Sequence, residues 1–283
     1  MLQISDPHAL RSWVRRERQA GRRIALVPTM GALHEGHLSL VDLARRRADA
    51  VVLSVFVNPL QFGPGEDYAR YPRDLARDAE LAARRGVDVL FAPAVEQMYP
   101  AGSEIRVVAG ETASDWEGAV RPGHFTGVLT VVAKLFNLVQ PDVAVFGQKD
   151  IQQATLIRKL VRDLDFPIAL AIGGTVREPD GLAMSSRNAY LSAAERRDAL
   201  ALVRALRAAE TAWKAGERDA ARLERILRDE FRMHPAVALD YIAIVDPADF
   251  RPVARAEPGT IIAVAGRVGT TRLLDNVILG AEP

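Results

Sequence analysis

Short apolar runs alternate with amphipathic segments along the first ~170 residues, and this alternation predicts an α/β domain built on a parallel sheet. The run from Ala50 to Val57 is apolar almost throughout, as expected of a strand that is buried on both faces. The segment from Leu38 to Arg47 instead places Leu40, Leu43 and Ala44 on one face of a helix. The predicted strands cover residues 24–27, 50–57, 87–91, 143–146 and 168–172, and the predicted helices cover residues 38–47, 74–85, 125–139 and 151–164.

The pattern changes near Gly173-Gly174, after which the stretch Glu178-Pro179-Asp180-Gly181 is typical of a turn. Beyond it, charged amphipathic helices are predicted at residues 193–215 and 219–233, and short strands at residues 239–245, 260–264 and 271–277. Helices followed by strands indicate a second, smaller α+β domain. We therefore expect a parallel-sheet domain at residues 1–175 and an α+β domain at residues 176–283.

The balance of positive and negative charge argues against nucleic acids and anionic membranes as binding partners. Lys and Arg number 37 and Asp and Glu number 36, which gives no basic surface for nucleic acid or for an anionic membrane. The chain has no cysteine, so disulfides, thiolate metal sites and cysteine nucleophiles are excluded. Residues 1–10 lack the apolar core of a secretory signal, and no apolar run reaches the length of a membrane span. We expect a soluble cytoplasmic protein.

The first candidate site follows the first predicted strand, in the stretch Pro28-Thr29-Met30-Gly31-Ala32-Leu33-His34-Glu35-Gly36-His37. Ligands of open parallel sheets bind at the carboxyl ends of strands, and the start of a helix offers N–H groups and positive dipole charge to an anion. His34 and His37 are three residues apart, so both can face one way and donate hydrogen bonds to phosphate oxygens. The alternatives are two structural histidines or a metal site, although a metal would need a further ligand.

A second candidate site follows the strand predicted at residues 143–146, in the stretch Gly147-Gln148-Lys149-Asp150-Ile151-Gln152-Gln153. Lys149 offers a point positive charge to phosphates. Asp150 can cap the helix that follows or accept a hydrogen bond from a ribose hydroxyl. Gln153 lies on the first helical turn and can point towards the same crevice. The alternative is an N-capped helix with a solvated lysine.

A third candidate site, Leu182-Ala183-Met184-Ser185-Ser186-Arg187-Asn188, follows the turn at the expected domain boundary. Its hydroxyl and backbone N–H groups can donate to a polyphosphate, and Arg187 can bind one with two parallel hydrogen bonds. An ordinary capped helix start is the alternative. The stretch Gly63-Pro64-Gly65-Glu66-Asp67 is either a mobile loop or a surface turn.

These motifs, taken in order, resemble those of the pantothenate synthetase family over essentially the whole chain. The His-x-Gly-His spacing and the Met-Ser-Ser-Arg stretch are also similar to the two signatures of the wider nucleotidyltransferase superfamily. The stretches that carry the family resemblance are residues 28–37, 57–63 (Val-Asn-Pro-Leu-Gln-Phe-Gly), 71–73 (Tyr-Pro-Arg), 121–128 (Arg-Pro-Gly-His-Phe-Thr-Gly-Val), 146–150 (Phe-Gly-Gln-Lys-Asp) and 177–188 (Arg-Glu-Pro-Asp-Gly-Leu-Ala-Met-Ser-Ser-Arg-Asn).

The resemblance implies an ATP-dependent ligase that joins pantoate to β-alanine through a pantoyl-adenylate and releases AMP and pyrophosphate. It implies a Rossmann-like domain with a smaller α+β lid domain, and a homodimer. It also implies Mg²⁺ bound through the phosphates of ATP rather than by a protein metal site. Because a reactive adenylate must be kept from water, we expect a mobile lid, formed by residues 63–67 or by the C-terminal domain.

The resemblance also assigns residues. Charge on the phosphates during adenylation would be held by His34, His37 and Lys149. The full set expected to bind ATP is Pro28, Thr29, Met30, His34, His37, Gly147, Lys149, Asp150, Val176, Met184, Ser185, Ser186 and Arg187. Pantoate would be held by Gln61, Gln153 and Met30. The residues expected near the site without an assigned role are Asn58, Tyr71 and His124, and Asp78 is a candidate near the metal.

Gly173-Gly174 departs from the family pattern, in which a bulkier residue or proline precedes Thr175, so the adenine pocket or the stiffness of a hinge is expected to differ. The rival hypotheses are a cytidylyltransferase, a class I aminoacyl-tRNA synthetase and a nucleotide-binding regulator without activity. The first would lack the two pocket glutamines and the lid. The second needs a tRNA-binding surface that the charge balance does not supply, and the third should have lost His34, His37 or Lys149.

Overall fold

The computed structural model describes residues 1–281, and these form two compact units. The parallel-sheet unit consists of Met1–Ala113, Arg121–Gly147 and Leu156–Gly173. The C-terminal unit consists of Ser114–Val120, Gln148–Thr155 and Gly174–Pro283, of which the last segment is described to residue 281. Two short segments from the first part of the chain therefore group with the C-terminal residues.

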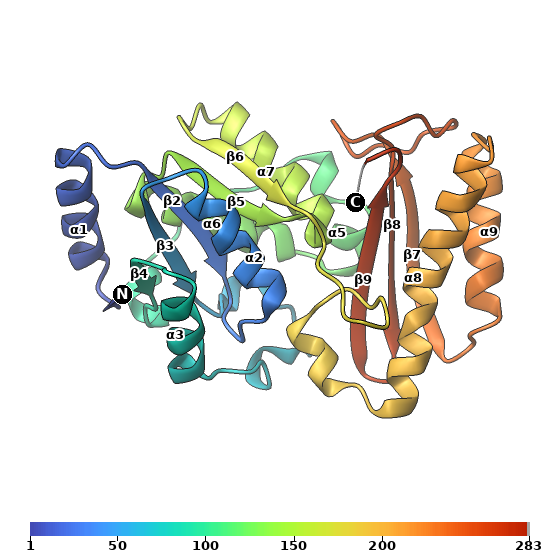
Figure 1. The fold of residues 1–283 in the computed structure, drawn as a ribbon, viewed down its shortest axis with the longest axis horizontal. Coiled ribbons are helices and arrows are strands. Elements are labelled where there is room, and N and C mark those ends of the chain that lie inside the picture. Colours follow the sequence, from blue (N-terminus) through green and yellow to red (C-terminus); the bar gives the residue numbers. More distant parts are fainter. Residues whose placement is uncertain (282–283) are drawn as a thin grey trace. The chain divides into compact units, whose positions relative to one another are not determined.

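The parallel-sheet unit is built on a six-stranded sheet in the order β1-β4-β3-β2-β5-β6, in which neighbouring strands are parallel (Figure 1). The strands are β1 (Leu2–Ile4), β2 (Ile24–Thr29), β3 (Ala50–Val55), β4 (Val89–Phe91), β5 (Val143–Gly147) and β6 (Ala169–Gly173). The strand order reverses between β2 and β5, which is where open α/β sheets bind ligands, at the carboxyl ends of the strands. The predicted parallel sheet is confirmed.

Helices cover both faces of this sheet. They are α1 (Pro7–Gln19), α2 (Glu35–Arg45), α3 (Leu75–Arg84), α6 (His124–Val139) and α7 (Ile151–Asp163), the last of which begins in the C-terminal unit. Successive residues of a strand point to opposite faces. Ile24 and Leu26 of β2 therefore join one core with α1, α6 and the later part of α7, whereas Ala25 and Val27 join another with α2 and α3. Burial on both faces explains why these strands are continuous apolar runs.

The hydrophobic pattern predicted neither β1 nor α1. β1 has only three residues and lies at the edge of the sheet, so it is too short to show a period. α1 is rich in arginine and buries only Leu10, Trp13 and Val14. It does carry the signals of a helix start, because Asp6 caps its first turn and Pro7 follows the cap.

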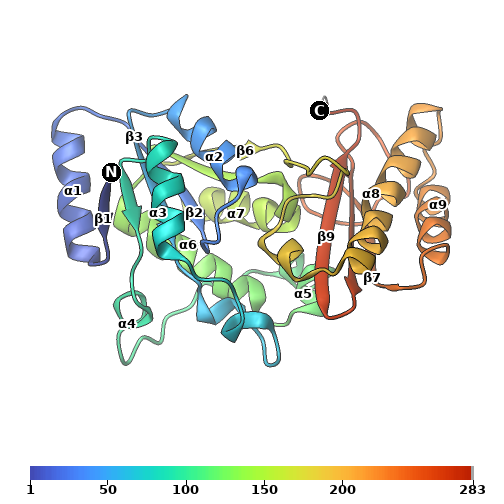
Figure 2. The ribbon, with the colours of Figure 1, turned by 60° about the horizontal axis from the view of Figure 1, so that its bottom comes forward.

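The C-terminal unit is built on an antiparallel sheet in the order β7-β8-β9 (Figure 1), and Figure 2 shows β7 and β9 of this sheet, with α8 and α9, from another direction. Its main elements are α8 (Ala193–Lys214), α9 (Ala220–Arg232), β7 (Val237–Val245), β8 (Ile261–Val268) and β9 (Thr271–Ile278). α8 and α9 pack on one face of the sheet, with Ile242, Ile262 and Leu273 in their shared core. The other face packs Ala243 and Ala263 against Ile151 at the start of α7. The predicted smaller α+β part of the fold is confirmed.

The remaining elements are short. They are the helices α4 (Val95–Met98) and α5 (Glu117–Val120) and the 3-10 helices η1 (Pro59–Gln61), η2 (Asp67–Ala69), η3 (Glu111–Ala113), η4 (Gln148–Asp150) and η5 (Ser186–Tyr190). Within residues 1–281, no helix is both long enough and apolar enough to cross a membrane.

Candidate active site

The loop between β2 and α2 carries the two histidines at the carboxyl end of a central strand. His34 occupies the N-cap position of α2, and His37 lies in the first turn of that helix. Their rings stack, with centroids 4.0 Å apart, and the carbonyl oxygen of His34 accepts a hydrogen bond from the backbone N–H of His37 at 2.8 Å. The first N–H groups of a helix lack partners inside it and carry positive dipole charge. The loop thus presents two imidazole rings and a helix N-terminus where the strand order reverses, an arrangement that suits an anion.

Asp78 of α3 fixes the shape of this loop. Its carboxylate oxygens accept hydrogen bonds from the backbone N–H groups of Ala32 (2.9 Å) and Leu33 (2.7 Å), and the residue is buried. Burial raises the pKa of this carboxyl above its ordinary value, while the two N–H groups act in the opposite direction. Gly31 has a φ of +80°, and a Cβ there would lie 2.8 Å from both Asp78 Oδ2 and Val55 Cγ1. We interpret Asp78 as the residue that shapes the loop, since both of its oxygens hold the backbone.

Replacing Asp78 with Ala should destabilise the fold, because the buried N–H group of Leu33 and the half-buried N–H group of Ala32 lose their acceptor. Leaving a buried N–H group without an acceptor costs about 1–3 kcal/mol. Asp74→Ala is the matched control, because Asp74 caps the same helix from an exposed position and such a cap contributes about 1 kcal/mol. Urea unfolding of both variants measures the difference. An equal loss of stability in the two would show that the loop does not depend on Asp78.

Gln61 is held by a network that explains the position of Asn58. The side-chain amide of Gln61 donates to Met30 Sδ at 3.0 Å, and its Oε1 accepts from Asn58 Nδ2 at 3.1 Å. Asn58 Nδ2 also donates to the carbonyl oxygen of Gly127 at 3.0 Å, and the Tyr99 hydroxyl donates to Asn58 Oδ1 at 2.9 Å. The structure therefore brings together Met30 and Gln61, both of which were expected to hold pantoate.

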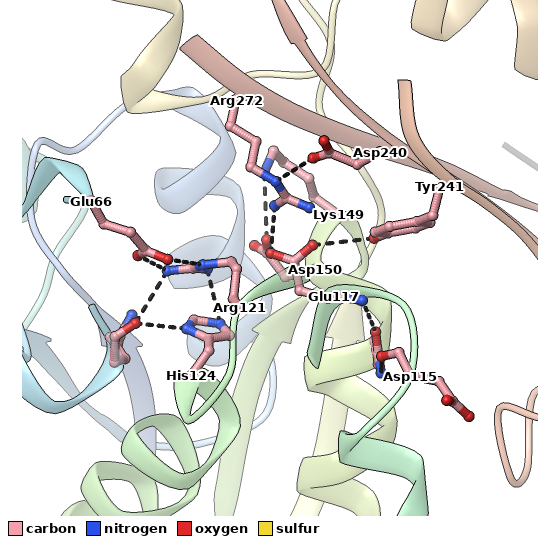
Figure 3. Close-up of polar contacts among 12 residues, drawn as sticks. Glu66, Asp115, Glu117, Arg121, His124, Lys149, Asp150, Asp240, Tyr241 and Arg272 are labelled. Atoms are coloured by element: carbon pink, nitrogen blue, oxygen red, sulfur yellow. Dashed lines mark hydrogen bonds and ion pairs between the residues drawn. The ribbon is translucent and has the colours of Figure 1, made fainter. Parts of the chain in front are cut away.

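Arg121 and His124, which lie next to each other in Figure 3, hold the backbone of Gln61. Arg121 Nη2 donates to the carbonyl oxygen of Gln61 at 3.1 Å, and His124 Nδ1 lies 2.9 Å from the same oxygen. If Nδ1 donates, Nε2 is left to accept from Arg121 Nη1 at 3.1 Å, so the neutral Nδ1–H tautomer satisfies both contacts. Sequence reasoning gave His124 no role and passed over Arg121. The sequence did contain an indication of their pairing. Arg121 and His124 lie three residues apart, just before a predicted helix, in the stretch at residues 121–128 that carries part of the family resemblance.

Glu66 connects the loop at residues 63–67 to this network. Its carboxylate forms a two-point ion pair with Arg121, at 2.9 Å and 2.6 Å. Burial alone would raise the pKa of Glu66, but the ion pair with Arg121 outweighs it and lowers the pKa below the ordinary value. The ionised carboxylate is therefore the form that holds the loop.

Other residues predicted near the site have contacts within the parallel-sheet unit. Thr29 Oγ1 donates to the carbonyl oxygen of Ser54 at 2.7 Å, which joins the carboxyl ends of β2 and β3. Tyr71 is buried and meets the ring of Phe62 edge-on, with centroids 6.1 Å apart. Pro28 is half-buried near the end of β2. The ligand contacts expected of Pro28 and Thr29 stay predictions.

Lys149 and its neighbours belong to the C-terminal unit and follow directly after β5. The Lys149 ammonium lies 3.5 Å from an oxygen of Asp150, and its side chain is 22% exposed. Gln153 is half-buried in the first turn of α7. The ammonium of Lys149, the carboxylate of Asp150 and the amide of Gln153 therefore all lie between the end of β5 and the first turn of α7.

The third motif forms a strap, which we define as residues 176–188. The strap folds back on itself, because the backbone N–H of Met184 donates to the carbonyl oxygen of Val176 at 2.9 Å. Ser185 caps η5, because its hydroxyl oxygen accepts from the backbone N–H of Arg187 at 3.3 Å. The strap thereby brings together Val176, Met184, Ser185, Ser186 and Arg187, all of which were expected to bind ATP.

A buried charged group in the C-terminal unit was missed by sequence reasoning (Figure 3). Arg272 of β9 donates to Glu117 at 2.6 Å and to Asp240 at 2.7 Å, and the Tyr241 hydroxyl donates to Glu117 at 3.3 Å. Burial, with the charge of Glu117, raises the pKa of Tyr241 well above its ordinary value. Burial would lower the pKa of Arg272, but its two carboxylate partners raise it. Glu117 and Arg272 stand 155 residues apart, so no local pattern indicates their pairing.

The parallel sheet, with a helix N-terminus and paired histidines at the reversal of strand order, defines a Rossmann-like nucleotide-binding fold. A family model described as pantoate-beta-alanine ligase matches residues 3–278. The chain belongs to this family and is therefore a ligase, as the sequence motifs predicted.

Individual relatives agree over nearly the whole chain. Pantothenate synthetase from Moorella thermoacetica is 55% identical over 271 residues, which cover 96% of each chain. The crystal structure of pantothenate synthetase from Thermus thermophilus matches with a TM-score of 0.94 and 51% identity, covering 98% of this chain and 99% of the other. A pantoate-beta-alanine ligase from Francisella tularensis, complexed with beta-gamma ATP and beta-alanine, matches with a TM-score of 0.83 and 34% identity, covering 100% of this chain and 99% of the other.

Proposed function

We propose that this chain joins pantoate to β-alanine in two steps, with ATP as the activating substrate. In the first step, a carboxylate oxygen of pantoate attacks the α-phosphorus of ATP, which forms pantoyl-adenylate and releases pyrophosphate. In the second step, the amine of β-alanine attacks the acyl carbon, loses a proton and displaces AMP, which leaves the amide bond of pantothenate. The observation that carries the proposal is the stacked pair His34 and His37 at the N-terminus of α2, in a chain of this family.

In the proposed adenylation step, His34, His37 and Lys149 stabilise the charge that builds on the phosphate oxygens. The stacking of the two imidazole rings supports this role, because it limits their orientation before a ligand binds. We assign the β- and γ-phosphates to Ser185, Ser186 and Arg187 of the strap. The remaining proposed contacts of ATP are Gly147 and Asp150 at the ribose, and Pro28, Thr29, Met30, Val176 and Met184 elsewhere along the nucleotide.

We propose that Gln61, Gln153 and Met30 hold pantoate. The network around Gln61 supports its part, because a side chain fixed by Asn58 and a backbone fixed by Arg121 and His124 lose little freedom on binding. Asn58, Arg121 and His124 are then positioning residues for Gln61. We retain residues 176–283 as the proposed lid domain and residues 1–175 as the proposed binding domain.

We propose that Mg²⁺ accompanies ATP. Among residues 1–281, no three or more Asp, Glu or His side chains are grouped so that they could hold a metal ion, and both oxygens of Asp78 hold backbone N–H groups. On the family resemblance, the ion would be held by phosphate oxygens, whose charge it neutralises in part. We also propose, from the family resemblance, that the chain forms a homodimer and acts in the cytoplasm. The mass in solution, measured by light scattering, tests the dimer.

The test of this function is to mix the protein with ATP and Mg²⁺, adding pantoate, β-alanine or both. Phosphorus NMR follows AMP and pyrophosphate, and mass spectrometry follows pantothenate. We expect pantothenate, AMP and pyrophosphate in equal amounts only when both acids are present. The same mixtures are repeated with CTP in place of ATP. Consumption of CTP but not ATP would indicate a cytidylyltransferase, and no consumption of either nucleotide would indicate a regulator.

Gly147→Ala should raise the KM for ATP about tenfold, because a methyl group at this strand end would meet a ribose that lies against the backbone. The fold itself should tolerate the change, since within the described part of the chain the nearest atom to the added Cβ is Leu40 Cδ1, at an ordinary contact distance of 3.8 Å. Gly110→Ala is the control, because it adds the same methyl group outside the motifs, and among residues 1–281 a Cβ there meets nothing within 4 Å beyond its chain neighbours. Its KM for ATP should equal that of the wild-type chain. An unchanged KM for ATP in Gly147→Ala would place the ribose elsewhere.

A further inference from the structure

β9 carries two consecutive buried polar residues, Asp275 and Asn276, which are 2% and 1% exposed. Successive side chains of a strand point to opposite faces of its sheet. Asp275 alternates with Leu273 on the face that packs against α8 and α9, and Asn276 lies on the opposite face. The two side chains therefore reach different segments of the same C-terminal unit, and both segments carry residues that we have assigned to ATP.

Asn276 holds the segment that contains Lys149. Its Nδ2 donates to the carbonyl oxygens of Gln148 (3.0 Å) and Lys149 (2.8 Å), and its Oδ1 accepts from the side-chain amide of Gln148 at 3.2 Å. One buried amide thus binds two successive carbonyl groups and one side chain in η4, immediately before α7. Fixing the carbonyl groups on both sides of the Lys149 Cα fixes the direction in which the Lys149 side chain leaves the backbone.

Asp275 holds the base of the strap. Its carboxylate forms a two-point ion pair with Arg177, at 2.6 Å and 3.0 Å, and also accepts the backbone N–H of Asn276 at 2.8 Å. Arg177 donates in addition to the carbonyl oxygen of Gly181 at 3.2 Å and pairs with Ala183 in an isolated antiparallel bridge. The ion pair therefore ties both arms of the strap to β9, next to the point where Asn276 holds the Lys149 segment.

We propose that Asp275 and Asn276 are positioning residues that hold Lys149 and the strap in one fixed arrangement. The lysine and the hydroxyl groups of the strap then meet the polyphosphate of ATP as a preformed set. The proposal rests on the proposed function, in which Lys149 and residues 185–187 bind ATP. Neither Asp275 nor Asn276 needs to touch the nucleotide, because each acts through the segment that it holds.

Asn276→Leu tests the proposal, because leucine is close to asparagine in shape but cannot form hydrogen bonds. We expect kcat/KM for ATP to fall about 10- to 100-fold, the effect of displacing a catalytic group by around an ångström. Asn276→Ser is the second variant, since the smaller side chain avoids overpacking and still cannot reach both carbonyl groups. Leu273→Ala is the matched control, because it makes a cavity against α8 and α9 on the same strand and leaves the Lys149 segment untouched.

A double-mutant cycle with Lys149→Ala separates positioning from general stability. If Asn276 acts through Lys149, Asn276→Leu should cost little once Lys149 is absent, whereas Leu273→Ala should have the same small effect in both backgrounds. A full, additive loss in the Lys149→Ala background would overturn the proposal, as would normal kcat/KM for ATP in both Asn276 variants.

Calorimetric titration with ATP gives a readout that does not depend on turnover. We expect the two Asn276 variants to bind ATP more weakly than the wild-type chain and the Leu273→Ala variant. A wild-type chain that binds ATP but makes no pantothenate would refute the proposed function, and the binding comparison would still decide the role of Asn276. Equal ATP affinity in all four proteins would overturn that role.

Discussion

Replacing His37 with Ala should leave the fold intact and slow the formation of pantoyl-adenylate by about 10²–10³-fold, the usual cost of removing one donor aimed at transition-state charge. His37 is half-buried in the first turn of α2, where a smaller residue is easily accommodated. Its imidazole stacks on His34, so the remaining histidine also loses part of what orients it. A single-turnover reaction of enzyme with ATP and pantoate, quenched and analysed for adenylate, measures the rate directly.

His8→Ala is the matched control, because His8 is an exposed histidine of α1, far along the chain from the motifs. Its adenylation rate should equal that of the wild-type chain, and both variants should keep the wild-type circular dichroism spectrum. Lys149→Ala should slow adenylation in the same way, since it removes a second side chain that is proposed to stabilise the charge on the phosphate oxygens. Near-normal adenylation by either variant would remove that residue from the mechanism.

Gly127→Ala should cost about 1–3 kcal/mol of stability, the range found when a packed interior must take an extra methyl group. A Cβ at Gly127 would lie 2.2 Å from the carbonyl oxygen of Leu60 and 2.5 Å from the backbone nitrogen of Gln61. The backbone atoms of Leu60 and Gln61 cannot change rotamer as a side chain can, so η1 would have to move away from α6. Because Gln61 lies in η1, the KM for pantoate should rise as well.

The direction of this effect is opposite to that expected from helix propensity, which favours Ala over Gly inside a helix by about 1 kcal/mol. Gly110→Ala is the control, because among residues 1–281 a Cβ there would meet nothing within 4 Å beyond its chain neighbours. Thermal unfolding and pantoate kinetics of the two variants make the comparison. If Gly127→Ala were as stable as the wild-type chain, the close packing of α6 on η1 would not be what holds Gln61.

Much of the parallel sheet could be predicted from the sequence because its strands are buried on both faces and therefore stand out as apolar runs. The helices of the C-terminal unit were predicted for a related reason, since α9 buries only one stripe, which includes Leu223, Leu227 and Phe231. β1 and α1 were not predicted, because β1 is three residues long and α1 is mostly exposed and buries only three residues.

The histidine loop could be placed at a ligand site from strand order alone, because the carboxyl ends of parallel strands share one edge. The residues that support the site could not be found in this way. Asp78 reaches a loop 46 residues earlier, and Asn276 holds carbonyl groups 127 and 128 residues earlier. In each of these contacts a side chain binds a backbone group. Every residue has such backbone groups, so the residue type at the bound position does not indicate the contact.

In the proposed reaction, the pantoate carboxylate attacks the α-phosphorus of ATP. This step is tested most directly by supplying pantoate labelled with ¹⁸O in its carboxylate, together with ATP, Mg²⁺ and β-alanine, and by recording the ³¹P spectrum of the products. We expect one ¹⁸O atom in AMP, seen as an upfield shift of its phosphorus signal, and none in pyrophosphate. The label in inorganic phosphate, with ADP as the other product, would instead show attack at the γ-phosphorus and would rule out the adenylate.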